Sequence, residues 1–88
     1  MSDTVSLIEQ RLTALSPQQL LVRDDSHLHA GHAGARAGGG HYQLTIVSQQ
    51  FSGLNRLARH RLVYQTLGDL MQNRIHALAI LALAPEES

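Results

Sequence analysis

The 88-residue sequence contains no cysteine, no lysine and no tryptophan, and only 3% of its residues are aromatic. Without cysteine, the chain can form no disulfide, no Cys-x-x-Cys redox centre and no thiolate metal site of its own. Two tyrosines and one phenylalanine offer little surface for stacking on bases. The formal net charge is zero with neutral histidines, so no strong general field favours nucleic acid or membrane.

Long apolar runs are also missing. No run approaches the roughly 20 residues that span a bilayer, and the first residues lack the pattern of a signal peptide. We therefore expect a cytoplasmic protein without membrane contact. The length, 43% hydrophobic content and 16% charged content suit one globular domain over residues 1–88. Within it we predict a flexible His/Gly-rich loop at about 25–40 and a frayed tail at 86–88.

The hydrophobic pattern predicts an α+β fold. Apolar spacing predicts a helix over residues 3–15, which Ser16-Pro17 ends because the residue before proline avoids the α region. Strands are predicted at 20–24 and 41–48, a helical region from Ser52 or Gly53 to about Gln72 with Gly68 as a weak interruption, and a last strand at 75–85. This order predicts an antiparallel hairpin, a third strand parallel to the second, and helices packed on one face.

Enzyme motifs are missing from the sequence. It contains no Gly-x-Ser-x-Gly elbow, no P-loop and no Gly-x-Gly-x-x-Gly. Ser26, His29 and Asp25 could be drawn as a triad, but a glycine-rich loop would not hold them in position. We therefore predict a protein that is not an enzyme.

Four of the six histidines lie in the stretch "DDSHLHAGHAGARAGGGHY", namely His27, His29, His32 and His41. His29 and His32 have a chelating spacing, and Asp24 or Asp25 could add an oxygen ligand. A structural zinc site, however, needs four rigid ligands, and the glycines soften this segment. We expect weak, adventitious metal binding from the loop alone.

His76 lies in the apolar sequence "RIHALAI". Strand alternation places it on the face of Leu78 and Ile80. One interpretation is a histidine at the edge of the core, with a ring nitrogen bonded to backbone. The other is a metal ligand, which requires the loop histidines to come close to it.

A basic cluster stands in "NRLARHRLVY", where Arg56, Arg59, His60 and Arg61 fall within six residues. Cations near a helix N-terminus oppose the macrodipole, so another interaction should favour them. Phosphate contacts are one possibility. The alternative is a solvated face with structural arginine contacts to Asp24 or Asp25.

Taken together, "DDSHLHAGH", "GGHYQLTIVSQQFSGL", "RHRLVYQTL" and "IHALAI" resemble the BolA family over roughly residues 6–86. The resemblance implies a class II KH-like domain of order α-β-β-α-α-β, with a three-stranded mixed sheet. It divides the helical region into two helices with a break near Arg59 to Arg61. We expect the terminal helix of many members to be truncated here.

The resemblance further implies an adaptor that binds a monothiol glutaredoxin and shares a bridging 2Fe–2S cluster, in iron–sulfur trafficking and iron or redox regulation. It implies His76 as one cluster ligand and a loop residue as the second, with His29 the best match and His32 its rival. The partner and glutathione would bring the sulfur ligands, and the free protein, a monomer or weak dimer, would hold no cofactor. His27 and His41 are assigned structural roles.

The family's other activity is transcriptional regulation through DNA binding. In this sequence the DNA contacts would come from the basic cluster Arg56, Arg59, His60 and Arg61. Nucleic-acid-binding KH domains carry a Gly-x-x-Gly loop between two helices, and this chain has none between its predicted helices. DNA is therefore the alternative partner.

Overall fold

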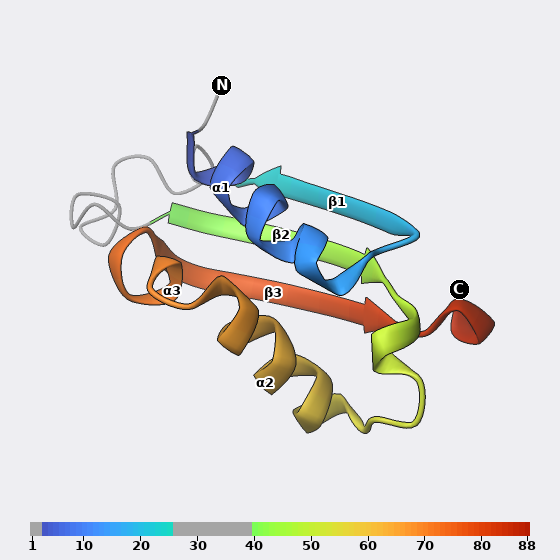
Figure 1. Ribbon diagram of the computed structural model, residues 1–88. Coiled ribbons are helices and arrows are strands. Elements are labelled where there is room, and N and C mark those ends of the chain that lie inside the picture. The colour runs from blue at the N-terminus through green and yellow to red at the C-terminus, as the bar shows by residue number, and fades with distance from the viewer. Residues whose placement is uncertain (1–2, 26–39) are drawn as a thin grey trace.

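A computed structural model describes residues 3–25 and 40–88 of the protein (Figure 1). The long elements are α1 (Asp3–Leu12), β1 (Gln19–Asp24), β2 (Gly40–Val47), α2 (Arg56–Leu67), α3 (Leu70–Asn73) and β3 (Ile75–Leu83). Short 3₁₀ turns, η1 (Thr13–Leu15), η4 (Gln49–Phe51) and η5 (Pro85–Glu87), connect or follow them. The element order is the predicted α-β-β-α-α-β.

The first helix is amphipathic and ends where the sequence predicts. Ile8, Leu12 and Leu15 recur at helical spacing and are all buried. Ser16 adopts a left-handed conformation at φ 48° and donates its N–H to the carbonyl of Thr13 at 3.0 Å. This left-handed residue turns the chain towards β1.

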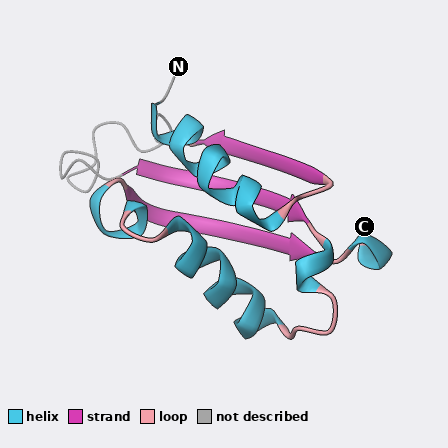
Figure 2. Cartoon of the chain, viewed as in Figure 1, coloured by secondary structure: helices cyan, strands magenta, loops and turns pink. Residues whose placement is uncertain are grey.

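The three strands form one mixed sheet in the order β1-β2-β3, with β2 in the centre (Figure 2). β1 pairs with β2 antiparallel, so that Leu21 lies opposite Thr45. β2 pairs with β3 parallel, so that Thr45 also lies opposite Leu81. The predicted hairpin and the predicted helical crossover to a parallel third strand are both confirmed.

The helical region begins and divides at other residues than predicted. α2 starts at Arg56 instead of near Ser52 or Gly53, because the Asn55 side chain caps it by accepting the N–H of Ala58 at 2.8 Å. The break between α2 and α3 lies at Gly68, whose φ is 58°. The break near Arg59 to Arg61 that the resemblance implied is therefore wrong, since these residues lie inside α2.

The core lies between the helices and one face of the sheet. The predicted alternation in β2 is confirmed, since Tyr42, Leu44 and Ile46 are buried in the main hydrophobic cluster. Each buried Leu, Ile or Phe contributes about 1.5–3 kcal/mol. The opposite face of the sheet has neither α1 nor α2 over it. The helices add these buried residues to the cluster: Ile8 and Leu12 from α1, and Val63 and Leu67 from α2.

Candidate functional site

The parallel strands β2 and β3 bring two histidines to the same end of the sheet. His41 is the second residue of β2 and His76 the second residue of β3. Their ring centroids are 5.1 Å apart, with ring planes inclined at 52°. We refer to His41 and His76 as the histidine pair.

A β-bulge at the start of β3 determines where His76 lies. The pairing register of the two strands shifts between Gly40 and His41, which leaves His76 as an extra residue in the ladder. His76 is exposed beside His41, whereas Leu78 and Ile80 pack against the core. The prediction that His76 shares the face of Leu78 and Ile80 is therefore wrong, because the bulge resets the alternation.

Local contacts hold the first residues of β2 in place. The N–H of Asp25 donates to the His41 carbonyl at 2.8 Å, and Arg23 donates to both carboxylate oxygens of Asp25 at 2.8 and 3.1 Å. The hydrogen bond to Asp25 raises the pKa of Arg23. A Cβ at Gly40 would collide with the Tyr42 ring, so only glycine allows this close packing. Together these contacts set the backbone position of His41.

The histidine pair has a ring separation that suits two imidazoles on one metal. With metal–nitrogen bonds of about 2.0–2.1 Å and a tetrahedral angle, two such rings have centroids roughly 5 Å apart. Within residues 3–25 and 40–88, no group of three or more metal-ligating side chains comes together. The separation is thus compatible with a metal ion at the His76 ring, for which the family resemblance implies a loop histidine as the second ligand.

The loop candidates His29 and His32 lie outside the described residues, as do His27 and Ser26. Their assignment therefore stays a prediction. The position of His41 on the second strand was predicted, but its proximity to His76 was not. The signal was available, since both strand starts carry a histidine and the strands were predicted to be parallel neighbours.

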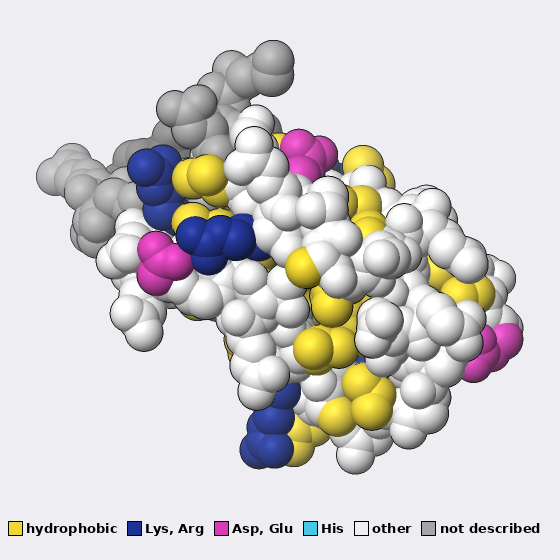
Figure 3. Space-filling view, viewed as in Figure 1, with side chains coloured by type: hydrophobic (Ala, Val, Ile, Leu, Met, Phe, Trp, Pro, Cys, Tyr) yellow, Lys and Arg dark blue, Asp and Glu magenta, His cyan; other side chains and the backbone are white. Residues whose placement is uncertain are grey.

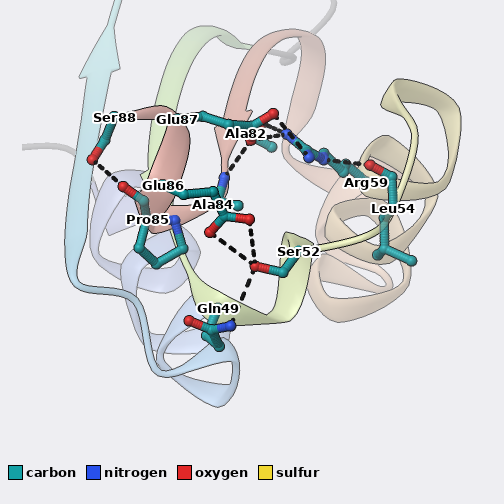
Figure 4. A network of polar contacts seen from close by, with 10 residues as sticks. All are labelled: Gln49, Ser52, Leu54, Arg59, Ala82, Ala84, Pro85, Glu86, Glu87 and Ser88. Carbon is teal, nitrogen blue, oxygen red and sulfur yellow. Dashed lines mark hydrogen bonds and ion pairs between the residues drawn. The ribbon is translucent and has the colours of Figure 1, made fainter.

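Arg59 is the centre of a polar network at the other end of β3 (Figure 4). Its guanidinium donates to the carbonyls of Leu54 at 2.8 Å and Ala82 at 3.0 Å. It also donates to both carboxylate oxygens of Glu87, at 2.6 and 3.2 Å. Only 13% of the Arg59 side chain is exposed. Arg59 therefore joins α2, β3 and η5.

The segment after β3 is part of this network. Glu87 also accepts the N–H of Ala84 at 2.7 Å, and Glu86 accepts a hydrogen bond from the Ser52 hydroxyl. The hydrogen bonds from Arg59 and then from Ala84 lower the pKa of Glu87. Ion pairing and a 3₁₀ turn thus connect Glu86 and Glu87 to the rest of the domain, in the segment for which a frayed tail is predicted.

The rest of the predicted basic cluster has a different environment. Arg56 and Arg61 are exposed, and the half-buried His60 has its ring 6.5 Å from the ring of Tyr64. On the side drawn in Figure 3, arginine side chains stand in separate groups instead of one continuous basic surface. A phosphate contact is therefore left to Arg56 and Arg61 within this cluster, since Arg59 is already used internally.

The structural arginine contact predicted for this cluster exists, but with another acid. Arg59 pairs with Glu87, and the Asp25 carboxylate pairs with Arg23. Glu87 lies 28 residues from Arg59 in the sequence, so spacing along a helix could not indicate the pair.

None of the helices in the described part of the chain is long and apolar enough to cross a membrane.

Comparison with known proteins identifies the family. A family model described as BolA-like protein matches residues 12–87. SufE-like protein 1, chloroplastic/mitochondrial, of Arabidopsis thaliana is 44% identical over 78 residues, which cover 83% of this chain and 21% of that protein. The chain thus spans about a fifth of this longer relative.

A bacterial relative and a solved structure support the same family. The DNA-binding transcriptional regulator BolA of Vibrio cholerae is 42% identical over 82 residues, or 92% of this chain and 74% of that protein. The BolA domain of SufE1 from Arabidopsis thaliana superposes with a TM-score of 0.86 at 37% identity, covering 100% of this chain and 99% of that one. This chain belongs to the BolA-like family and has its mixed α+β fold.

Proposed function

We propose that the protein is an adaptor that binds a monothiol glutaredoxin and co-ligates a bridging 2Fe–2S cluster. His76 is one ligand, and His29 is the second, with His32 as the rival from the same loop. The observation that carries the proposal is the exposed His76 ring at the start of β3, beside a second imidazole. The strand position is the one for which the family resemblance implies a ligand.

The donor chemistry agrees with this assignment. Iron–sulfur clusters are mostly held by thiolates, and imidazoles can replace two of them, which raises the reduction potential. This chain has no cysteine and six histidines, so it can offer imidazole nitrogen but no thiolate sulfur to a cluster. The partner and glutathione would therefore supply the sulfur ligands. Neutral imidazole is the binding form, and the protein must present it unprotonated.

The proposal is tested by titrating the protein into a cluster-loaded monothiol glutaredoxin while recording visible absorption and circular dichroism. We expect a new spectrum at a defined stoichiometry, which His76→Ala abolishes. His29→Ala and His32→Ala, compared separately, identify the loop ligand. His60→Ala on α2 is the matched histidine control and should leave the spectrum unchanged. An unaltered spectrum with the unmodified chain, or full retention in His76→Ala, would contradict the proposal.

A second candidate function is DNA binding through the basic cluster Arg56, Arg59, His60 and Arg61. The name of the Vibrio cholerae relative supports it. Since Arg59 is paired internally, the affinity would depend on Arg56 and Arg61. Two phosphate contacts correspond to a slope of about −2 in log K against log salt concentration. The double variant Arg56→Ala, Arg61→Ala should remove this slope in gel-shift titrations, and salt-independent binding would contradict this function.

A further inference from the structure

The last strand is apolar on both sides. β3 has the sequence IHALAILAL, in which His76 is the sole polar side chain. Leu78 and Ile80 pack against the core, while Ala79 and Leu81 are exposed on the opposite face. A sheet with one solvated face normally alternates apolar and polar residues, whereas apolar runs are typical of strands covered on both faces. The sequence of β3 thus indicates that something covers its outer face.

Two exposed leucines stand on this outer face in one row across the sheet. Leu21 of β1 is 60% exposed and Leu81 of β3 is 52% exposed. Both lie opposite Thr45 of the central strand, so their Cα atoms are separated by two strand spacings, or roughly 10 Å. Exposed apolar side chains that gather in one place mark contact surfaces. We call Leu21, Thr45, Ala79 and Leu81 the open sheet face.

The histidine pair lies at one end of the same face. In β2, Tyr42, Leu44 and Ile46 point into the core, so His41 and Thr45 belong to the outer side. Thr45 lies four residue steps after His41 along the strand, which is about 13 Å. A standard interface buries about 800 Å² on each partner and is thus roughly 30 Å across. One partner can therefore cover the histidine pair and both leucines.

We propose that the open sheet face is the surface on which the cluster-carrying thiol protein docks, with Leu21 and Leu81 as its apolar anchors. This inference rests on the proposed function. The occupant follows from the proposed function, because a cluster shared through His76 needs thiolate ligands that a chain without cysteine does not supply. The molecule that supplies the sulfur ligands of a cluster bound by His76 would lie over the face on which this ring is exposed. On the same side of the sheet, Arg23 and Gln43 lie between the histidine pair and the row of the two leucines.

The test uses the whole chain and a cluster-loaded monothiol glutaredoxin. The double variant Leu21→Lys, Leu81→Lys places two charges on the open sheet face, and the milder Leu21→Thr, Leu81→Thr retains β propensity. Leu57→Lys is the matched control, since Leu57 is 58% exposed but stands on α2. We expect the double-lysine variant to weaken complex formation at least about tenfold, as loss of an anchor does. The control should bind like the unmodified chain.

Far-ultraviolet circular dichroism and thermal unfolding of the free variants check that each one folds. If the double-lysine chain is destabilised, the threonine pair carries the test and should still weaken binding measurably. Binding equal to that of the unmodified chain would overturn the docking surface, as would an equal loss in Leu57→Lys. So would a dimer of the unmodified chain that the lysines convert to monomers while glutaredoxin binding is retained.

The failures of the two proposals are distinguishable. If the unmodified chain gives the new spectrum, His76→Ala loses it and the leucine variants retain it, then only the docking surface is wrong. If the unmodified chain produces no new spectrum with the loaded glutaredoxin, the proposed function falls and the docking surface falls with it.

Discussion

The two ends of β3 carry the two polar features that stand out in the sequence, and they are used in opposite ways. At the first end, His76 is exposed beside His41 on the outer side of the sheet. At the C-terminal end of β3, the guanidinium of Arg59 on α2 is hydrogen-bonded to two carbonyls and one carboxylate of this chain. Both features resembled ligand sites in the sequence. Arg59 has its bonding capacity used internally, whereas His76 presents its ring to solvent.

Residue type alone therefore does not identify a site. A guanidinium has five N–H donors, and a partly buried one finds protein acceptors for them because unmade bonds are costly. An exposed imidazole has no such requirement, because water satisfies it. We therefore expect substitutions at the Arg59 end to lower stability, and substitutions at the His76 end to alter binding while leaving stability unchanged.

The largest loss of stability is expected for Arg59→Ala. It removes the donors to Leu54 and Ala82 and leaves the Glu87 carboxylate without its ion pair. Hydrogen bonds that involve a charged group contribute about 1.5–3 kcal/mol, so the free energy of unfolding should fall by about 2–3 kcal/mol. Urea denaturation measures it. Arg56→Ala, at an exposed position on the same helix, is the control and should lie within about 0.5 kcal/mol of the unmodified chain. An equal loss of stability in Arg59→Ala and Arg56→Ala would contradict a stabilising role of the Arg59 network.

Next comes Glu87→Gln, with an effect that depends on pH. The pKa of Glu87 is lowered in the folded protein, so its carboxylate stabilises the fold above its ordinary pKa of 4.5. That contribution is lost as the pH falls through the lowered folded value. The glutamine variant should therefore be less stable than the unmodified chain at pH 7, and the difference should shrink below about pH 4.5. Urea denaturation at pH 7, 5, 4 and 3 measures this difference, and a gap that does not change with pH would contradict the ion pair.

A smaller effect is expected for Asp69→Asn. Asp69 pairs with Arg11 at 3.0 Å between α1 and the turn before α3, and the hydrogen bond from Arg11 lowers the Asp69 pKa. Both side chains are well exposed, so salt screens this pair more than the Arg59 network. The loss seen at low salt should nearly vanish in 1 M sodium chloride. Persistence of the full loss at 1 M salt would show that Asp69 acts by another route.

The smallest change in stability is expected for His76→Ala. His76 is exposed, so the free energy of unfolding should change by less than about 0.5 kcal/mol. The same substitution should abolish the spectral change with the cluster-loaded glutaredoxin. If His76→Ala lowered the free energy of unfolding as much as Arg59→Ala, His76 would be a structural residue. The contrast between the two ends of β3 would then be wrong.

Most of the fold could be predicted from local pattern. The helix at 3–15 and the strands at 20–24, 41–48 and 75–85 are all found, with small differences at their ends, because their apolar spacing agrees with burial on one side. The start of α2 could not be predicted, since Ser52, Gly53 and Asn55 are all suitable helix starts. The capping bond from Ala58 to Asn55 settles the choice.

The site was predicted only in part. His76 was singled out as a candidate ligand, but its face was assigned wrongly, because a single bulge residue reverses strand alternation and leaves no mark in composition. The Arg59–Glu87 pair could not be predicted either. It depends on how η5 folds back beside α2 after β3, which is a long-range arrangement.

The element order, the apolar faces of α1 and β2, and the supply of imidazole instead of thiolate ligands can all be read from the amino-acid sequence. These follow from periodicity and from residue type, which are local properties. The three-dimensional fold is needed to see that His41 and His76 are neighbours, that Arg59 is used internally, and that Leu21 and Leu81 share an uncovered face. Those arrangements depend on strand register and on contacts between segments that are distant in the sequence. The packing of the whole chain determines both.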